Sequence, residues 1–296
     1  MGSPKGSYLV SADIRPHFFI GSERFRWAFA FTPRYKVRIF QDNAAQGDSS
    51  LPVRTPSFMP GGILYIPLNL GDPNVYKDIQ FLSVAFFHHS NGQDHRTFLS
   101  NGQFNLYNGN FSTNFFEVGY TKNWRTPSSQ NVTFECRNSS DPCKTNYPTG
   151  YKDYVWKIAL EQHFGTAFEQ RGTYGRTRLN SNFQFIRVNN FRWLSKTSNP
   201  NRDDCQLCSC YLKERFRIVG DIAVNLDKLE KPFNSLDRRI NFEASFLYRV
   251  AAGNTALFAS TGFYGNDPYN IYYSHKYAFF RVGLALGMYV HTLKMY

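Results

Sequence analysis

The fold is decided by an alternating segment near the C-terminal end, Phe280-Arg281-Val282-Gly283-Leu284-Ala285-Leu286-Gly287-Met288. Successive side chains of a β-strand point to opposite faces, so this segment predicts a strand with one apolar face and one face of small or charged residues. Soluble strands are usually ~5–6 residues long, whereas ~9–11 residues are needed to cross a bilayer. Charges and glycine opposite an apolar stripe are typical of a strand between lipid and a polar lumen.

Similar segments cover the chain and predict an all-β fold, a transmembrane antiparallel β-barrel of about 12 strands that forms one domain over residues 1–296. The candidate strands lie near 8–19, 24–32, 35–42, 57–69, 77–91, 111–123, 151–163, 180–196, 212–227, 238–251, 255–265 and 275–292. We expect polar loops at 43–56, 92–110, 164–179 and 197–211, and a polar connection over 124–150. The periodicity alone leaves an all-β sandwich or a soluble barrel equally open.

Composition favours the membrane barrel. Aromatic residues make up 18% of the 296 residues, with 29 Phe and 19 Tyr. The mean hydropathy is −0.45, and no segment approaches the ~18 apolar residues that indicate a membrane-spanning helix. Residues 1–7 lack the apolar core of a signal peptide, and we interpret them as the start of a mature chain.

The net charge of +12 raises the question of a nucleic-acid partner. The basic residues are scattered along strands and loops, and anionic lipid head groups explain them as well. We therefore expect no nucleic-acid partner.

Five cysteines lie in two polar connections. Cys136 and Cys143 flank a short loop that a disulfide could close, whereas Cys205, Cys208 and Cys210 form a Cys-x-x-Cys-x-Cys pattern. That spacing also suits a metal, but a fourth ligand is not evident nearby. The preferred interpretation is loop disulfides with one free thiol, in an oxidising compartment.

The chemistry-bearing segment is His88-His89-Ser90-Asn91-Gly92, at the end of a predicted strand. Residues i and i+2 of a strand share a face, so His88 and Ser90 can meet as base and nucleophile. The same face carries Leu82, Val84 and Phe86. A polar pair that continues an apolar stripe is readily explained if that stripe faces lipid.

This His-x-Ser-Asn-Gly motif resembles that of the bacterial outer-membrane phospholipase A family, whose members are twelve-stranded barrels. Ser50–Pro56, Tyr8–Val10 and Phe280–Leu284 look like the family's segment before its fourth strand, its first strand and its closing strand. The resemblance implies a phospholipase of the Gram-negative outer membrane that hydrolyses acyl ester bonds of glycerophospholipids. Its partners would be membrane phospholipids, with a homodimer or an outer-membrane complex as the assembly.

The resemblance also implies roles for the site residues. Ser90 would be the nucleophile and His88 the general base, oriented by an Asn from the next strand. The candidates are Asn101, Asn105, Asn110 and Asn114. Asn114 tops an apolar stripe, as His88 and Ser90 do, and is preferred. Asn105 lies in a Phe-Asn-Leu-Tyr segment closer to the family's local motif and stays the alternative.

An oxyanion in this family is stabilised by the backbone amide of the nucleophile and by Ca²⁺. The implied oxyanion loop is Asn91 and Gly92, and Asp94 and Ser100 are candidate Ca²⁺ ligands. Gln93 stands where the family usually has Arg, and the loop that leads to Asn114 is longer than the family's.

Two other interpretations stay open besides the phospholipase. The polar cluster would be a head-group-level strand end in a non-catalytic barrel, which would be a pseudoenzyme, a scaffold of a complex or a narrow channel. A soluble all-β binding module is the second. We expect His89, His95 and Asp94 to be solvated loop residues. An interfacial aromatic belt is predicted at Tyr264, Tyr269, Tyr272, Tyr273, Tyr277, Trp124, Trp156 and Trp193.

Overall fold

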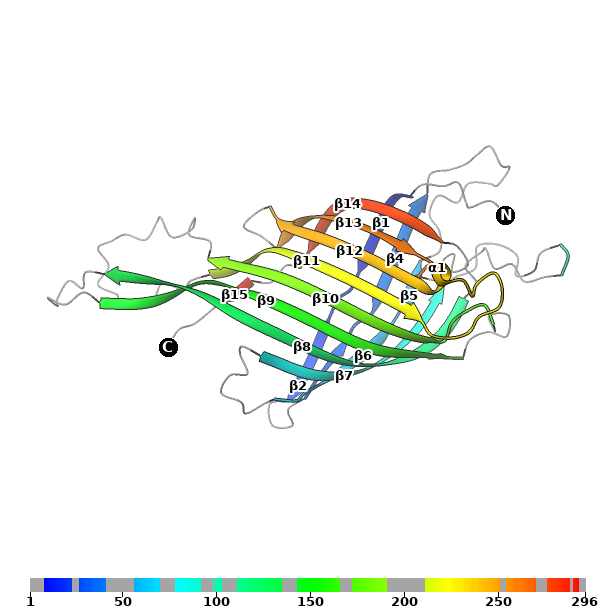
Figure 1. Ribbon diagram of the computed structural model, residues 1–296, viewed down its shortest axis with the longest axis horizontal. Helices are drawn as coiled ribbons and strands as arrows, with labels where there is room; N and C mark the ends of the chain where they lie inside the picture. The colour runs from blue at the N-terminus through cyan, green and yellow to red at the C-terminus, as the bar shows by residue number, and fades with distance from the viewer. Residues whose placement is uncertain are drawn as a thin grey trace.

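The chain folds almost entirely as one antiparallel β-sheet in the computed structural model (Figure 1). The structure describes residues 8–22, 27–40, 56–69, 78–91, 98, 100–102, 111–134, 143–165, 172–190, 211–250, 254–269, 276–287 and 290–292. Within these ranges there is a single short helix, α1 (Leu236–Arg239). No helix in them has the length and apolar character that crossing a membrane requires.

The sheet contains fifteen strands. They are β1 (Tyr8–Ile14), β2 (Phe18–Ser22), β3 (Trp27–Phe31), β4 (Arg34–Phe40), β5 (Ser57–Met59), β6 (Gly61–Pro67), β7 (Asp78–Asn91), β8 (Phe111–Phe134), β9 (Cys143–Phe164), β10 (Thr177–Asn190), β11 (Tyr211–Asn225), β12 (Ile240–Arg249), β13 (Thr255–Tyr264), β14 (Tyr277–Leu286) and β15 (Val290–Thr292). The main path has eleven strands, β1-β4-β5-β7-β8-β9-β10-β11-β12-β13-β14. The sheet is therefore built from hairpins in chain order.

The N-terminal part of the sheet consists of short strands in pairs, β1 and β2, β3 and β4, and β5 and β6, and the backbone pairing is interrupted within each pair. β1 and β2 pair with β4 and β3 respectively, and β5 and β6 both pair with β7. A proline lies at each break, Pro16, Pro33 and Pro60. Proline has no N–H to donate to the ladder, so pairing is interrupted there and resumes beyond it.

The predicted all-β, antiparallel class is confirmed, but two details of the prediction are wrong. The segments 24–32 and 35–42 are two halves of one ladder, β3 and β4, separated at Pro33. The polar connection over 124–150 is largely strand, because the β8–β9 pairing continues to Phe134 and Cys143. No backbone pairing joins β14 to β1 within the described ranges.

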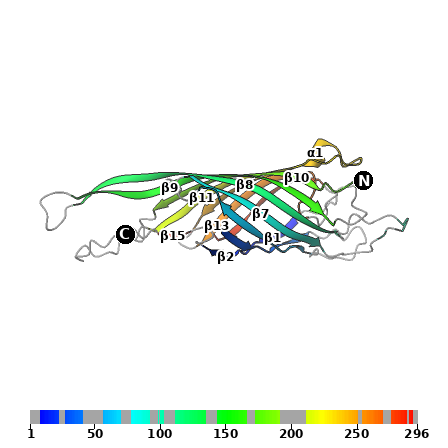
Figure 2. The ribbon, with the colours of Figure 1, turned by 90° about the horizontal axis from the view of Figure 1, so that it is seen from below.

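The sheet is strongly curved, and its first strands lie across from its last ones (Figures 1 and 2). The inner faces of the two ends are tied together by Arg38 on β4, which donates to the Asp267 carboxylate at 2.6 and 2.8 Å. Both side chains are buried. The curved sheet thus encloses a polar interior.

The outer face is apolar on nearly every strand. On β14 the outward residues Phe280, Val282 and Leu284 are 72%, 70% and 68% exposed. Other outward residues are also exposed, including Val84, Phe116, Val118, Leu160, Phe183, Ile222, Phe246 and Leu257. Contiguous exposed apolar surface of this kind is rare on soluble monomers and marks contact with a membrane or another protein.

The β8–β9 hairpin is longer than its neighbours. β7 begins at the pair Asp78–Trp124, and β10 pairs with β9 only as far as Gly150. The rest of the hairpin projects past the sheet as a two-stranded ribbon (Figure 1). This end of the sheet lies opposite the end of β7 that carries Ser90.

Candidate functional site

Strand β7 has an exposed apolar face and a buried face of mixed character, on which Ala85 and Phe87 alternate with polar residues. Leu82, Val84 and Phe86 are exposed, whereas Ser83 and His89 are buried. His88 and Ser90 follow the exposed stripe and are half-buried. They therefore lie on the outer wall of the sheet, at the end of its apolar surface.

The neighbouring strand places an amide beside His88. β7 and β8 pair in a register that sets His88 opposite Asn114 and Ser90 opposite Ser112. His88 Nδ1 lies 2.9 Å from Asn114 Oδ1. An amide oxygen only accepts, so His88 Nδ1 carries the proton of the neutral ring and Nε2 is left as its basic nitrogen.

Ser90 lies on the same face as His88 but does not contact it directly. The two residues share a face at i and i+2, but no hydrogen bond joins their side chains in the described structure. A nucleophile and its base are often further apart before substrate binds than during the reaction. The arrangement is a His–Asn pair with a serine hydroxyl on the same face.

Aromatic rings surround this polar group. Phe86 and Phe116 lie one residue pair further along the wall, with ring centroids 5.1 Å apart, and Phe164 stacks on Phe116 at 5.3 Å. On the other side, Phe58 is opposite Ser90 and packs edge-on against Tyr35. On the outer wall, His88, Ser90 and Asn114 are thus bordered by aromatic side chains.

The Asn114 amide is closely packed at its other end. Gly165 follows β9 with φ +66°, and a Cβ there would lie 3.1 Å from Asn114 Nδ2. The buried Thr113 hydroxyl donates to the Phe164 carbonyl at 3.2 Å, which fixes the end of β9 against β8. Glycine at position 165 therefore provides room for the amide that orients His88.

The inner face behind the site is a separate polar network. His89 is buried, and its Nε2 lies 2.8 Å from Ser57 Oγ and 3.2 Å from the Tyr269 carbonyl. Asn91 also donates to that carbonyl, at 3.1 Å. The prediction that His89 is a solvated loop residue is therefore wrong. Asn91 points to the opposite face from Ser90, so its side chain does not belong to an oxyanion loop.

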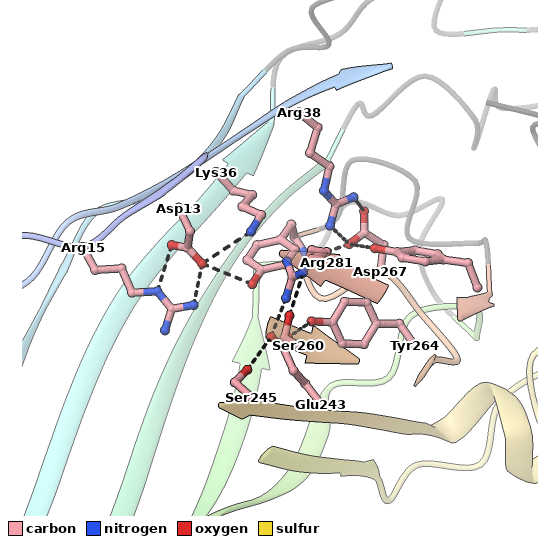
Figure 3. Close-up of polar contacts among 12 residues, drawn as sticks. Asp13, Arg15, Lys36, Arg38, Glu243, Ser245, Ser260, Tyr264, Asp267 and Arg281 are labelled. Carbon is pink, nitrogen blue, oxygen red and sulfur yellow. Dashed lines mark hydrogen bonds and ion pairs between the residues drawn. The ribbon is translucent and has the colours of Figure 1, made fainter. Parts of the chain in front are cut away.

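Tyrosines predicted to form an interfacial belt point inward instead. Tyr264 donates to Glu243, Tyr269 donates to Asp13 at 3.3 Å, and Tyr277 donates to Asp267 at 3.4 Å. Burial, followed by the charge of Asp13, raises the pKa of Tyr269 to about 12, so its hydroxyl stays a donor. Figure 3 shows this inner network. Because side chains alternate along a strand and Phe280 points outward, the sequence could have predicted that Tyr277, three residues earlier, points inward.

Two predicted girdle residues do lie on the outer face, Trp124 and Trp156, which are 38% and 39% exposed. They lie at the opposite end of the wall from Ser90, because Trp124 pairs with Asp78 at the start of β7. Tyr272, Tyr273 and Trp193 lie outside the described residues.

The predicted calcium ligands are not assembled by the described part of the chain. Ser100 lies in an exposed turn, whereas Gly92, Gln93, Asp94, His95, Asn105 and Asn110 lie outside the described residues. Asn101 lies in the same exposed turn as Ser100. No cluster of three or more His, Cys, Asp or Glu that could hold a metal occurs in the ranges described.

The cysteines give no further information on a disulfide or metal site. Cys143 begins β9 opposite Phe134, and Cys136, Cys205, Cys208 and Cys210 lie outside the described residues. The disulfide pairing therefore stays a prediction.

Comparison with known proteins gives no relative for this chain. No protein-family model matches it, and no curated protein and no solved structure matches it either.

Proposed function

We propose that this chain is an outer-membrane β-barrel phospholipase whose Ser90, His88 and Asn114 act on the outer wall, at the level where lipid acyl esters lie. The observation that carries the proposal is the His88–Asn114 hydrogen bond of 2.9 Å on the exposed, apolar face of the sheet. A polar pair at the edge of an apolar wall suits a substrate that arrives from within a bilayer.

The membrane part of the proposal is supported by the two faces of the sheet. Exposed apolar residues cover the outer face, and ion pairs such as Arg38–Asp267 lie on the inner one. Transmembrane barrels have this distribution because their outer side chains contact lipid and their inner ones contact water or each other. In a bacterial outer membrane, Trp124 and Trp156 would lie at the interface opposite Ser90.

The proposed reaction is acyl transfer in two steps. Ser90 Oγ attacks the ester carbonyl carbon while His88 Nε2 takes its proton, and a tetrahedral intermediate forms. The carbon–oxygen bond to the glycerol then breaks, and His88 gives the proton to the leaving alcohol, so a lysophospholipid departs. Water, deprotonated by His88, then attacks the acyl-serine carbonyl, the carbon–Oγ bond breaks, and His88 returns the proton to Ser90 Oγ as the fatty acid leaves.

Asn114 acts through His88. Its amide oxygen accepts the Nδ1 proton and therefore keeps the basic Nε2 directed away from β8. A neutral amide stabilises the imidazolium formed during the reaction less than a carboxylate would. Its main contribution is the orientation and tautomer of the ring.

Calcium dependence and dimer formation are expectations from the family resemblance, and no step above requires them. The described residues do not assemble a calcium site, and Asp94 lies outside them. Fatty-acid release measured with added Ca²⁺ and with a chelator tests the dependence directly.

The experiment that tests the function is fatty-acid release from mixed phospholipid–detergent micelles by the purified protein. Wild-type protein should release fatty acid, and Ser90→Ala should lower the rate by roughly 10³-fold or more. Ser112→Ala is the matched control, because Ser112 lies opposite Ser90 on the same wall. Equal rates for wild type and Ser90→Ala would contradict the assignment.

A non-catalytic barrel is the second candidate, and it is favoured by the missing Ser90–His88 hydrogen bond in the described structure. The two candidates differ in the reactivity of Ser90. A fluorophosphonate should label Ser90 of the folded protein if the hydroxyl is activated, and folded protein that stays unlabelled and releases no fatty acid would favour the non-catalytic barrel.

A further inference from the structure

The inner face of the sheet encloses a cavity of about 240 Å³ that the proposed reaction does not use. One side is lined by Asp13, Arg15, Arg34 and Lys36, from β1, β4 and the residue after β1. The opposite side includes Glu161, Arg178 and Asp221, from β9, β10 and β11. The cavity lies behind the wall that carries His88, so an argument about it stands apart from the proposed phospholipase activity.

On the first side, several cations depend on one carboxylate. Arg15 donates twice to Asp13, at 2.9 and 2.6 Å. Lys36 Nζ lies 3.6 Å from the same carboxylate and 4.6 Å from the centre of the Tyr269 ring. Figure 3 shows Arg15 and Lys36 converging on Asp13. The single carboxylate of Asp13 is therefore shared by Arg15 and Lys36, and Arg34 is a third cation on this side.

Arg34 has no carboxylate of its own. It makes no ion pair and no side-chain hydrogen bond with any described residue, and its buried Nε lacks a partner. Its guanidinium lies over the Phe87 ring, 4.7 Å from the centroid, and this contact holds the group against the wall. The side chain is half-buried and its Nε is buried without a partner, which is costly for a charged group, so an anion at this position would stabilise it.

The opposite side of the cavity does not supply the missing charge. Glu161 accepts from Arg178 at 3.3 Å, from Asn180 at 3.1 Å and from His163 at 2.5 Å. Asp221 accepts from Asn182 at 2.7 Å. The described lining holds four cations, Arg15, Arg34, Lys36 and Arg178, and three carboxylates, Asp13, Glu161 and Asp221.

From this imbalance we infer that the cavity binds a small oxyanion, a phosphate or a carboxylate, with Arg34 as its principal ligand. The planar guanidinium presents parallel N–H donors that match the oxygens of such anions. Lys36 lies two residues along the same strand and adds a second positive charge on the same face. The cavity volume holds a small anion together with several waters.

The test is isothermal titration calorimetry of the purified full chain in detergent, with inorganic phosphate and with acetate as separate titrants at constant ionic strength. Saturable binding of at least one anion is expected. Arg34→Met should weaken it tenfold or more, and Arg34→Lys should weaken it less, because the charge is kept and the planar donor set is lost. Binding of phosphate alone would identify a tetrahedral site, and binding of both would identify a general oxyanion site.

Arg176→Met is the matched control, because Arg176 is exposed and does not line the cavity. It removes the same charge and should leave the affinity unchanged. Equal loss in Arg176→Met and Arg34→Met would reduce the effect to net charge and overturn the proposal. Absence of saturable binding by the wild-type protein would overturn it too, without bearing on fatty-acid release.

Discussion

His88 and His89 are neighbours in the chain and occupy two different environments. His88 lies half-buried on the apolar outer wall, with Asn114 as the partner of Nδ1. His89 lies buried on the inner face, between Ser57 and the Tyr269 carbonyl. Ser90 lies near His88 by its position on the strand, and Ser57 contacts His89, but only His88 lies on the outer wall.

The comparison shows why a Ser–His contact alone is a poor guide to catalysis. Ser57 Oγ lies 2.8 Å from His89 Nε2, whereas no hydrogen bond joins Ser90 to His88 in the described structure. Yet both Ser57 and His89 are buried in the interior of the sheet. His89 also contacts a carbonyl oxygen through the same Nε2. That nitrogen is therefore occupied, whereas His88 Nε2 makes no hydrogen bond with any described residue.

The first prediction separates the two histidines. His88→Ala should lower fatty-acid release by roughly 10³-fold or more and leave the unfolding free energy nearly unchanged. His89→Ala should retain most of the activity and lower the unfolding free energy by about 1–3 kcal/mol, because Ser57 and the Tyr269 carbonyl lose a buried partner. Activity assays and denaturant titrations of both variants measure this. The reverse pattern would move the site to the inner face.

The second prediction tests whether the outer wall contacts lipid. Val118 lies mid-strand on β8 between Val84 and Leu160, all exposed. Val118→Arg should cost about 2–4 kcal/mol in lipid vesicles if the position is near the bilayer midplane. Thr126→Arg, on the same face beyond Trp124, is the control and should cost at most about 1 kcal/mol. Denaturant titration of vesicle-inserted protein gives both values, and similar small costs would argue for a solvated wall.

The third prediction distinguishes the two candidate orienting residues. Asn114→Ala should lower kcat by about 10²-fold with little change in KM, because the ring of His88 loses its orienting acceptor. Asn105→Ala should leave kcat nearly unchanged. Steady-state kinetics on micellar phospholipid measures both variants. A large loss in Asn105→Ala together with an active Asn114→Ala would reverse the assignment.

Alternation in the sequence was sufficient to predict the antiparallel all-β class and most strands of the C-terminal half, because one face of each strand is apolar and the other is not. It failed where no apolar face is needed. The ribbon formed by the ends of β8 and β9 extends past the sheet, so its sequence is polar on both sides and looks like a loop. The break at Pro33 divided one ladder into two segments that each alternate like a full strand.

For the site, the alternation of side chains predicted that Asn114 lies on the same face of the sheet as His88. Alternation does not determine which residues of two neighbouring strands lie opposite each other. The segment between β7 and β8 has a length that admits several pairings, and only the structure gives His88 opposite Asn114. The polar network on the inner face could not be predicted from the sequence, for a different reason. Arg38 and Asp267 are 229 residues apart, and their contact depends on the curvature of the whole sheet.

The last and smallest prediction concerns Gly165, which gives room to the Asn114 amide. Gly165→Ala would place a Cβ 3.1 Å from Nδ2 and a side chain at φ +66°, so the amide must shift by a few tenths of an ångström and the backbone is strained by about 1 kcal/mol. We expect kcat to fall a few-fold. Gly102→Ala is the matched control, because Gly102 has φ +77° and a Cβ added there would meet nothing within 4 Å. If both variants keep full kcat, the packing behind Asn114 does not determine the orientation of His88, and the outer site is more tolerant than the buried one around His89.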